Sequence, residues 1–228
     1  MLKNGVKLYP FSSFEELISF VDQHKGILIA MNAGKIGRSS DEMKSIINRN
    51  IGYADGIAAV EALKKKGVVK PIKIPGCELW LKIIEKKVKD YSFYLVGGKQ
   101  EVIDRTVEQL HKDYPGINIL GYRNGYLKGD DEEHLIDDIV DKKPDVVFVA
   151  MGSPKQELLM ENMLRRHPAI YQGLGGSFDV YTGKMKRAPE WWINHNLEGP
   201  YRVMTDHKKW KRFVQDLVVI LKIKSGLI

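Results

Sequence analysis

The chain has 228 residues, of which 43% are hydrophobic, so it can bury a substantial core as one large α/β domain or two small lobes. Its single cysteine, Cys77, excludes an internal disulfide and predicts a reducing compartment. The net charge of +7 is concentrated in residues 184–228, where ten basic side chains outnumber four acidic ones, while residues 1–183 carry 26 basic and 25 acidic side chains. This asymmetry excludes a generally cationic protein and predicts an anionic partner for the tail.

Two features favour a cytoplasmic location. The first ten residues contain Lys3 and Lys7 and no long apolar run, so we expect no secretory signal peptide. The longest apolar run near the C-terminus, residues 217–221, is far too short to span a bilayer.

Short β-branched runs alternate with longer helical patterns along most of the chain. The predicted strands cover residues 27–31, 51–54, 92–96, 117–121, 146–151 and 169–174. The predicted helices cover residues 41–50, 56–66, 78–90, 100–113, 132–142 and 155–166, with apolar residues at helical spacing. This alternation predicts an α/β, Rossmann-like domain over residues 1–183, with a mostly parallel sheet and helices on both faces.

Five predicted strands end in small or polar residues. The endings are N-A-G at 32–34, D-G at 55–56, G-G-K at 97–99, G-S at 152–153 and G-G-S at 175–177. In a parallel sheet these endings meet at one rim, where α/β proteins bind their ligands. The sequence therefore predicts a ligand cleft at this rim.

Residues 149–157, V-A-M-G-S-P-K-Q-E, allow two interpretations. Ser153 fits a helix N-cap, Pro154 fits the first helical position, and Ser153 with Gln156 fits a capping box. Lys155 then lies at the positive end of the helix dipole, which is unfavourable unless an anion binds there. The stretch is either a capped helix or a helix start that receives a phosphate.

Several familiar reaction classes lack their motifs. The chain has no G-x-G-x-x-G, no G-x-x-x-x-G-K-[ST] and no G-x-S-x-G, which disfavours dinucleotide oxidoreductases, P-loop nucleotidases and α/β-hydrolases. Histidine and cysteine show no metal-site spacing, and no Asp-x-Asp pair is present. Any bound phosphate must be held by backbone amides, helix N-termini and basic side chains.

Two aspartates have two interpretations each. Asp55 lies between a strand and a helix in Y-A-D-G, where an N-cap is the more common role and a ligand-binding carboxylate the alternative. Asp179 is either a turn former or a ligand-binding carboxylate. Composition does not separate these readings.

Six segments in order resemble the WecG/TagA/CpsF family of bacterial glycosyltransferases, from near residue 27 to the tail. They are N-A-G-K (32–35), Y-A-D-G-I (53–57), P-G-C-E-L-W (75–80), F-Y-L-V-G-G-K (93–99), V-A-M-G-S-P-K-Q-E (149–157) and G-L-G-G-S-F-D-V-Y-T-G-K-M-K-R-A-P (173–189). Within the family the chain is most similar to the WecG-like branch.

The resemblance implies an inverting transfer without a metal or other cofactor, in cell-surface polysaccharide synthesis. The donor would be a UDP-activated N-acetylmannosaminuronic acid or N-acetylmannosamine, and the acceptor the 4-hydroxyl of undecaprenyl-diphospho-N-acetylglucosamine. Asp55 corresponds to the family's proposed general base, and Asn32 to an asparagine that would orient substrate hydroxyls.

The resemblance also implies a set of substrate-binding residues. Gln156 would contact the donor while Lys155 offsets diphosphate charge, and four glycines would let the backbone approach the nucleotide: Gly97, Gly98, Gly175 and Gly176. Arg202 and Arg212 of the tail are candidates for gripping diphosphate. The remaining expected contacts are Lys73, Glu157, Asp179, Arg187 and Tyr201.

Three positions depart from the family pattern. Ala30 replaces a threonine, Lys73 replaces an arginine and so offers a point charge instead of a fork, and Gly199 replaces a tryptophan in the tail. These changes bear on which donor sugar is bound more than on the type of reaction.

Residues 184–228 are predicted to form a helical, basic, membrane-proximal appendage. Its apolar stripe at helical spacing comprises Trp210, Phe213, Val214, Leu217, Val218 and Leu221. By pattern alone this is a helix packed on the domain or an interfacial helix, and a lipid-linked acceptor favours the second. We therefore expect a peripheral protein on the inner face of the cell membrane. The resemblance leaves both a monomer and a homo-oligomer open, since relatives self-associate.

Two other functional classes remain as alternatives. A sugar-nucleotide-binding protein without catalysis would use Asp55 only as a cap. A nucleic-acid-binding module would explain the basic tail, but the chain lacks the aromatic-studded basic strands and DNA-reading motifs of that class. We therefore expect no nucleic-acid partner.

Overall fold

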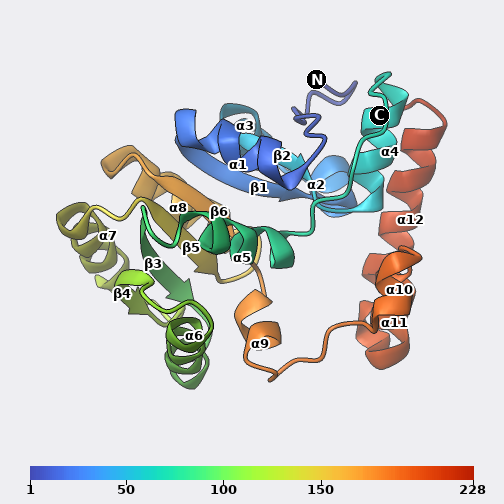
Figure 1. Ribbon diagram of the computed structural model, residues 1–228. Helices are drawn as coiled ribbons and strands as arrows, with labels where there is room; N and C mark the ends of the chain where they lie inside the picture. Colours follow the sequence, from blue (N-terminus) through green and yellow to red (C-terminus); the bar gives the residue numbers. More distant parts are fainter.

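Six parallel strands form one sheet in the order β2-β1-β6-β5-β3-β4 in the computed structural model, which describes all 228 residues (Figure 1). The strands are β1 (Gly26–Met31), β2 (Ile51–Ala54), β3 (Ser92–Gly97), β4 (Asn118–Arg123), β5 (Val146–Ala150) and β6 (Ile170–Gly173). The predicted Rossmann-like α/β class is confirmed, and each predicted strand lies within two residues of an observed one.

Helices cover both faces of this sheet and continue into the tail. They are α1 (Phe14–Gln23), α2 (Ala33–Arg38), α3 (Asp41–Arg49), α4 (Ile57–Lys65), α5 (Gly76–Lys87), α6 (Gln100–Asp113), α7 (Asp131–Lys142), α8 (Lys155–Arg166), α9 (Ser177–Tyr181), α10 (Glu190–Asn194), α11 (Glu198–Thr205) and α12 (Trp210–Lys224). A short 3-10 turn, His207–Lys209, joins the last two. None of these helices has the length and apolarity that crossing a bilayer requires.

The strands alternate side chains between two separate cores. In β1, Ile27, Ile29 and Met31 face a core shared with α2, α3, α4, α7, α8 and α12, whereas Leu28 faces a core shared with α1, α5, α6 and α9. The helix after β1 thus covers one face and the helix after β6 covers the other. Because β1 and β6 are neighbours, the chain diverges to opposite faces between their carboxyl ends, which is where ligands of such sheets bind.

One predicted helix cap was wrong, and the helices α1 and α2 were not predicted. Ser153 does not cap α8, because the helix begins at Lys155 with Pro154 as its N-cap and without a side-chain cap. The Gln156 side chain instead reaches across the strand ends to Gly152 and Gly175. Helix α1 was not predicted at all, although Ser13 caps it by accepting a hydrogen bond from Glu16 N.

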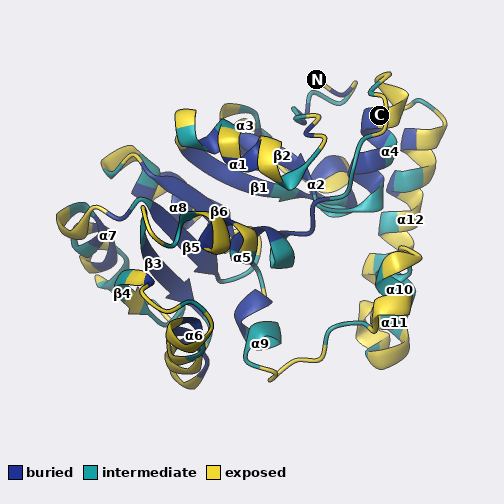
Figure 2. Cartoon of the chain, viewed as in Figure 1, coloured by how far each residue is buried: buried dark blue, intermediate teal, exposed yellow.

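Helix α12 packs on α2 and α4 through a face that the sequence prediction did not single out (Figure 2). Val219 and Ile223 are buried there, and Arg38 of α2 forms an ion pair with Asp216, with Nη2 2.6 Å from Oδ1. Most of the predicted apolar stripe lies exposed on the opposite side, at Trp210, Val214, Leu217, Val218 and Leu221. The helix is therefore docked by one apolar face and leaves a second one uncovered.

We expect Gly37→Ala to weaken this docking. Alanine normally stabilises a helix by about 1 kcal/mol over glycine. Here a Cβ at position 37 would lie 2.3 Å from Val219 Cγ2. Such overpacking costs about 1–3 kcal/mol, so the free energy of unfolding, measured by chemical denaturation, should fall. In a Val219→Ala background the same change should be neutral or stabilising, and stabilisation in both backgrounds would contradict the docking.

Candidate active site

Asp55 lies at the carboxyl end of β2, beside the end of β1. Met31 pairs with Ala54 in the ladder, and the Asp55 N–H continues it by donating to the Met31 carbonyl at 3.2 Å. The Asp55 side chain does not cap α4, whose N-cap is Gly56. Its Oδ1 instead accepts the Gly76 N–H at 2.7 Å, while Oδ2 makes no hydrogen bond within the chain. The N-cap interpretation is wrong, and one carboxylate oxygen remains available.

The electrostatic setting makes Asp55 a better proton acceptor than an ordinary aspartate. Burial raises the pKa of Asp55 above its usual value, and the Gly76 N–H and the Lys35 ammonium partly oppose that rise. From α11, Glu198 raises the same pKa and Arg202 lowers it. A raised pKa makes the Asp55 carboxylate a stronger base, which suits general-base chemistry.

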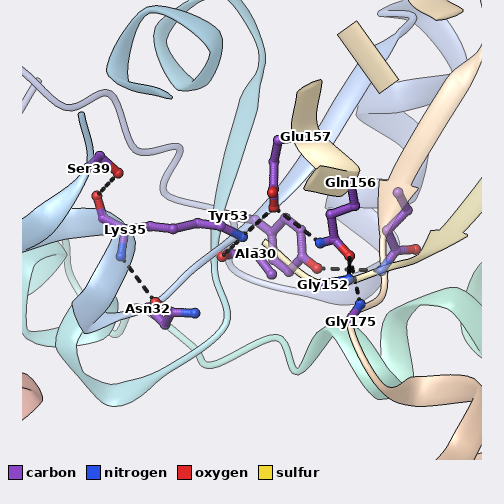
Figure 3. A network of polar contacts seen from close by, with 10 residues as sticks. Ala30, Asn32, Lys35, Ser39, Tyr53, Gly152, Gln156, Glu157 and Gly175 are labelled. Carbon is purple, nitrogen blue, oxygen red and sulfur yellow. Dashed lines mark hydrogen bonds and ion pairs between the residues drawn. The ribbon is translucent and has the colours of Figure 1, made fainter. Parts of the chain in front are cut away.

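Asn32 begins α2 directly after β1 and lies next to Asp55 in space. Its Oδ1 accepts the Lys35 N–H at 3.1 Å, so it is the N-cap of α2, while its Nδ2 makes no hydrogen bond within the chain (Figure 3). A Cβ added at Gly56 would lie 4.0 Å from Asn32 Cβ, which places the two strand ends side by side. The amide and the carboxylate thus flank one spot on the rim.

Gln156 connects the ends of β5 and β6 (Figure 3). Its buried carboxamide accepts the Gly152 N–H at 3.1 Å and the Gly175 N–H at 3.0 Å through Oε1. Its Nε2 donates to Glu157 Oε1 at 3.1 Å. Gly173 makes room for it, since a Cβ there would lie 2.3 Å from Gln156 Nε2. The buried Gln156 side chain thus holds the backbone of the loops that follow β5 and β6.

Lys155 and Glu157 flank Gln156 in opposite environments. Lys155 is exposed at the start of α8 and forms no ion pair. Glu157 is 1% exposed and pairs with Lys35, whose Nζ lies 2.9 Å from Glu157 Oε1. Lys155 can therefore meet an anion at the rim, whereas the Glu157 carboxylate is turned into the protein.

Helix α11 brings tail residues to the same rim. Glu198 accepts from Lys73 Nζ at 3.2 Å, and Arg202 Nη2 lies 3.9 Å from the other Glu198 oxygen. Arg187 reaches α5 by pairing with Glu78, and its charge acts on the neighbouring Cys77 thiol. Lys73, Glu198 and Arg202 thus gather near Asp55.

The other expected contacts lie elsewhere on the chain. Gly97 ends β3 and Gly98 follows it, and β3 is separated from β1 by β5 and β6. Asp179 is half-buried in α9, the helix that follows Gly175 and Gly176. Tyr201 packs its ring against Trp192, with centroids 5.6 Å apart. Arg212 is exposed on α12 and makes no ion pair. A cavity of about 270 Å³ lies between α6 and the segment after α9, and none of the expected site residues lines it. The candidate site is therefore the group of polar side chains at the rim and not this cavity.

The sequence interpretation missed three participants. Lys35 stood inside the N-A-G-K segment without a role, Tyr53 was read only as a strand residue, and Gln172 was not noticed in β6. Gln172 is fully buried and donates to the Gly76 carbonyl at 3.2 Å and to Tyr53 Oη at 3.4 Å. A lysine or glutamine inside a strongly apolar pattern was the available signal.

The description of the matching family model is "Glycosyl transferase WecG/TagA/CpsF family", and the match covers residues 5–225. The chain belongs to this family. Membership makes it a glycosyltransferase of cell-surface polysaccharide synthesis, and the family implies a sugar-nucleotide donor and a lipid-linked acceptor in general. No group of three or more His, Cys, Asp or Glu side chains is placed to hold a metal ion. Independence from metals stays a prediction.

Asp55→Asn should stabilise the protein at neutral pH. Because the folded-state pKa of Asp55 is raised, the folded chain binds more protons than the unfolded chain between the ordinary and the raised value, and stability falls as pH rises through that window. Asparagine keeps an Oδ1 acceptor for the Gly76 N–H without the buried charge.

Melting temperatures at neutral pH and near pH 3 measure this effect. The advantage of the variant should be present at neutral pH and disappear below the ordinary aspartate pKa. The exposed Asp141→Asn substitution on α7 is the control and should change neither value. A variant that melts below the parent at neutral pH would contradict a net cost of burying the charge.

Proposed function

We propose that the protein is an inverting glycosyltransferase of the WecG-like kind. It moves N-acetylmannosaminuronic acid or N-acetylmannosamine from a UDP donor to the 4-hydroxyl of undecaprenyl-diphospho-N-acetylglucosamine. The observation that carries the proposal is the Asp55 carboxylate, held at the rim by the Gly76 N–H with Oδ2 free of internal partners. Family membership supplies the general reaction class.

The reaction needs one proton acceptor and one stabilised leaving group. Asp55 Oδ2 takes the proton of the acceptor hydroxyl as the hydroxyl oxygen forms a bond to the anomeric carbon of the sugar. The bond from that carbon to the diphosphate oxygen breaks on the opposite side, so the configuration inverts and UDP leaves. The unpaired Nδ2 of Asn32 is positioned to donate to a substrate hydroxyl.

Charge on the departing diphosphate is met by groups that the rim presents. Lys155 is exposed without an ion pair at the start of α8, where the helix dipole also favours an anion. Lys73 and Arg202 lie near Asp55 and share one carboxylate, Glu198. Departing UDP would therefore meet positive charge without a bound metal.

The uncovered face of α12 supports a membrane-proximal tail. Exposed Trp210, Leu217 and Leu221 lie on one side of the helix. The surrounding basic side chains are also exposed: Lys208, Lys209, Lys211, Arg212, Lys222 and Lys224. Apolar side chains among lysines fit the boundary between headgroups and acyl chains, and each basic residue near an anionic surface contributes about 1 kcal/mol. We propose that this face meets the leaflet that carries the acceptor.

Asp55→Asn should abolish transfer and spare nucleotide binding. Loss of a general base lowers the rate by about 10²–10⁴-fold. Transfer is measured with a short-chain analogue of the lipid acceptor and a panel of UDP-sugars, with and without EDTA, and UDP affinity by calorimetry. Asp141→Asn is the matched control. Unchanged turnover in Asp55→Asn contradicts the base assignment, and UDP binding without transfer to any acceptor favours the non-catalytic alternative.

Replacing Leu217 and Leu221 by serine should weaken binding to vesicles that contain anionic lipid. Burying a leucine contributes about 1.5–3 kcal/mol, so partitioning in a flotation assay should fall at least about tenfold. The control replaces two exposed apolar residues elsewhere, Val69 and Tyr126, by serine. Equal loss in both variants, or loss in neither, would count against the membrane role of α12, and a shift of DNA in a gel would revive the nucleic-acid alternative.

A further inference from the structure

Lys35 and Glu157 form a buried ion pair between two helices that follow different strands. Lys35 belongs to α2 after β1, Glu157 to α8 after β5, and β6 lies between these strands in the sheet. Lys35 is 9% exposed and Glu157 is 1% exposed, and their charged atoms are 2.9 Å apart. Lys35 Nζ also donates to the Ala30 carbonyl at 3.1 Å, at the end of β1. The pair therefore lies at the part of the rim where the chain segments after β1 and β6 leave toward opposite faces of the sheet.

Stability alone is a poor explanation for this pair. Removing two charges from water is expensive, and apolar residues of similar volume often replace a buried ion pair with no loss of stability. Glu157 is not fully satisfied either, because its buried Oε2 has no hydrogen-bond partner. A buried ion pair at the rim that stability explains poorly is a candidate for a role in the site.

The pair fixes the direction of the Gln156 carboxamide. Glu157 Oε1 accepts from both Lys35 Nζ and Gln156 Nε2, so the amide nitrogen of Gln156 must face Glu157 and its oxygen must face the loops (Figure 3). That oxygen then receives the N–H groups of Gly152 and Gly175. An amide turned by 180° would present N–H groups to N–H groups and release both loops.

The same lysine acts on Asp55. It shares α2 with Asn32, and its positive charge opposes the rise in the pKa of Asp55 that burial causes. The other titratable or charged groups that act with Asp55 come from β2, α5 and α11: Tyr53, Cys77, Glu198 and Arg202. Lys35 therefore belongs to the hydrogen-bond network that holds the Gly152 and Gly175 loops, and its charge also acts on the Asp55 carboxylate.

We propose that Lys35 and Glu157 are a positioning pair. They hold the Gln156 side chain against the Gly152 and Gly175 loops, and so fix the position of these loops, on the donor side of the rim, relative to Asp55 and Asn32. The inference rests on the proposed function for the identity of the nucleotide. Glu157 is then a positioning residue and not a substrate contact.

The test replaces both partners together, because removing one alone leaves a buried charge and can prevent folding. Lys35→Met with Glu157→Leu should melt near the parent temperature. The matched control is the Lys87–Asp22 pair between α5 and α1, 2.6 Å apart on the other face of the sheet, replaced as Lys87→Met with Asp22→Leu.

Three readouts separate positioning from a merely structural role. In the double variant we expect turnover to fall about 10–100-fold, the size of effect that misplacement by about 1 Å produces, and UDP binding to weaken. The pKa of Asp55, followed by carboxyl-carbon NMR in the unliganded protein, should rise, because, of the two removed charges, it is the Lys35 cation that lowers this pKa. The acid limb of the rate profile should then move to higher pH. The control pair should change none of these.

Outcomes for this proposal and for the proposed function are distinguishable. A folded double variant with the parent's UDP affinity and Asp55 titration would overturn the positioning role, whatever the transfer assay shows. If the parent protein itself transfers no sugar while the Asp55 titration and the Gln156 side-chain amide signals shift in the double variant, the proposed reaction fails and the positioning role stands.

Discussion

The parallel pairing of β1 with β2 on one side and β6 on the other is the constraint from which the site follows. Parallel strands end at the same edge, so Asn32, Asp55 and the loop after Gly173 have to emerge together. The Asp55 N–H bond to Met31 extends the ladder one residue beyond the strands and fixes where the side chain starts. The catalytic candidates are therefore placed by backbone hydrogen bonds, not by a mobile loop.

Buried polar groups then convert this shared edge into a defined surface. Gln172 links β6 to Tyr53 and to the first residue of α5, while Gln156 and Glu157 link the ends of β5 and β6 to α2. Each buried polar atom is costly unless it is paired, so such networks hold one arrangement of the loops and penalise others. These networks contribute a defined geometry of the rim more than added stability.

The elements of the sheet could be predicted from the sequence, and the contacts of the site could not. Strong periodicity located every strand and all the helices between them except the short α2, because a strand or helix is decided by near neighbours. The local pattern leaves Asp55 between a cap and a ligand-binding carboxylate, because the partner that decides between them, Gly76, is 21 residues away in sequence. The capping box of Ser153 and Gln156 fails for the same reason, because the Gln156 side chain bonds to Gly175, 19 residues away. In α12 the apolar pattern predicted a helix but not the docked face, since Val219 and Ile223 are also apolar.

The charge balance around Asp55 explains why the site combines a buried carboxylate with a basic tail. Burial raises the pKa of Asp55, and a lysine from the sheet domain opposes that rise without abolishing it. Helix α11 adds one carboxylate and one guanidinium, Glu198 and Arg202, whose effects on Asp55 have opposite signs. The two charges of the tail therefore oppose each other at the base. Under the proposed function, a donor diphosphate that drew Arg202 away from Glu198 would alter that balance, and donor binding would then change the proton affinity of Asp55.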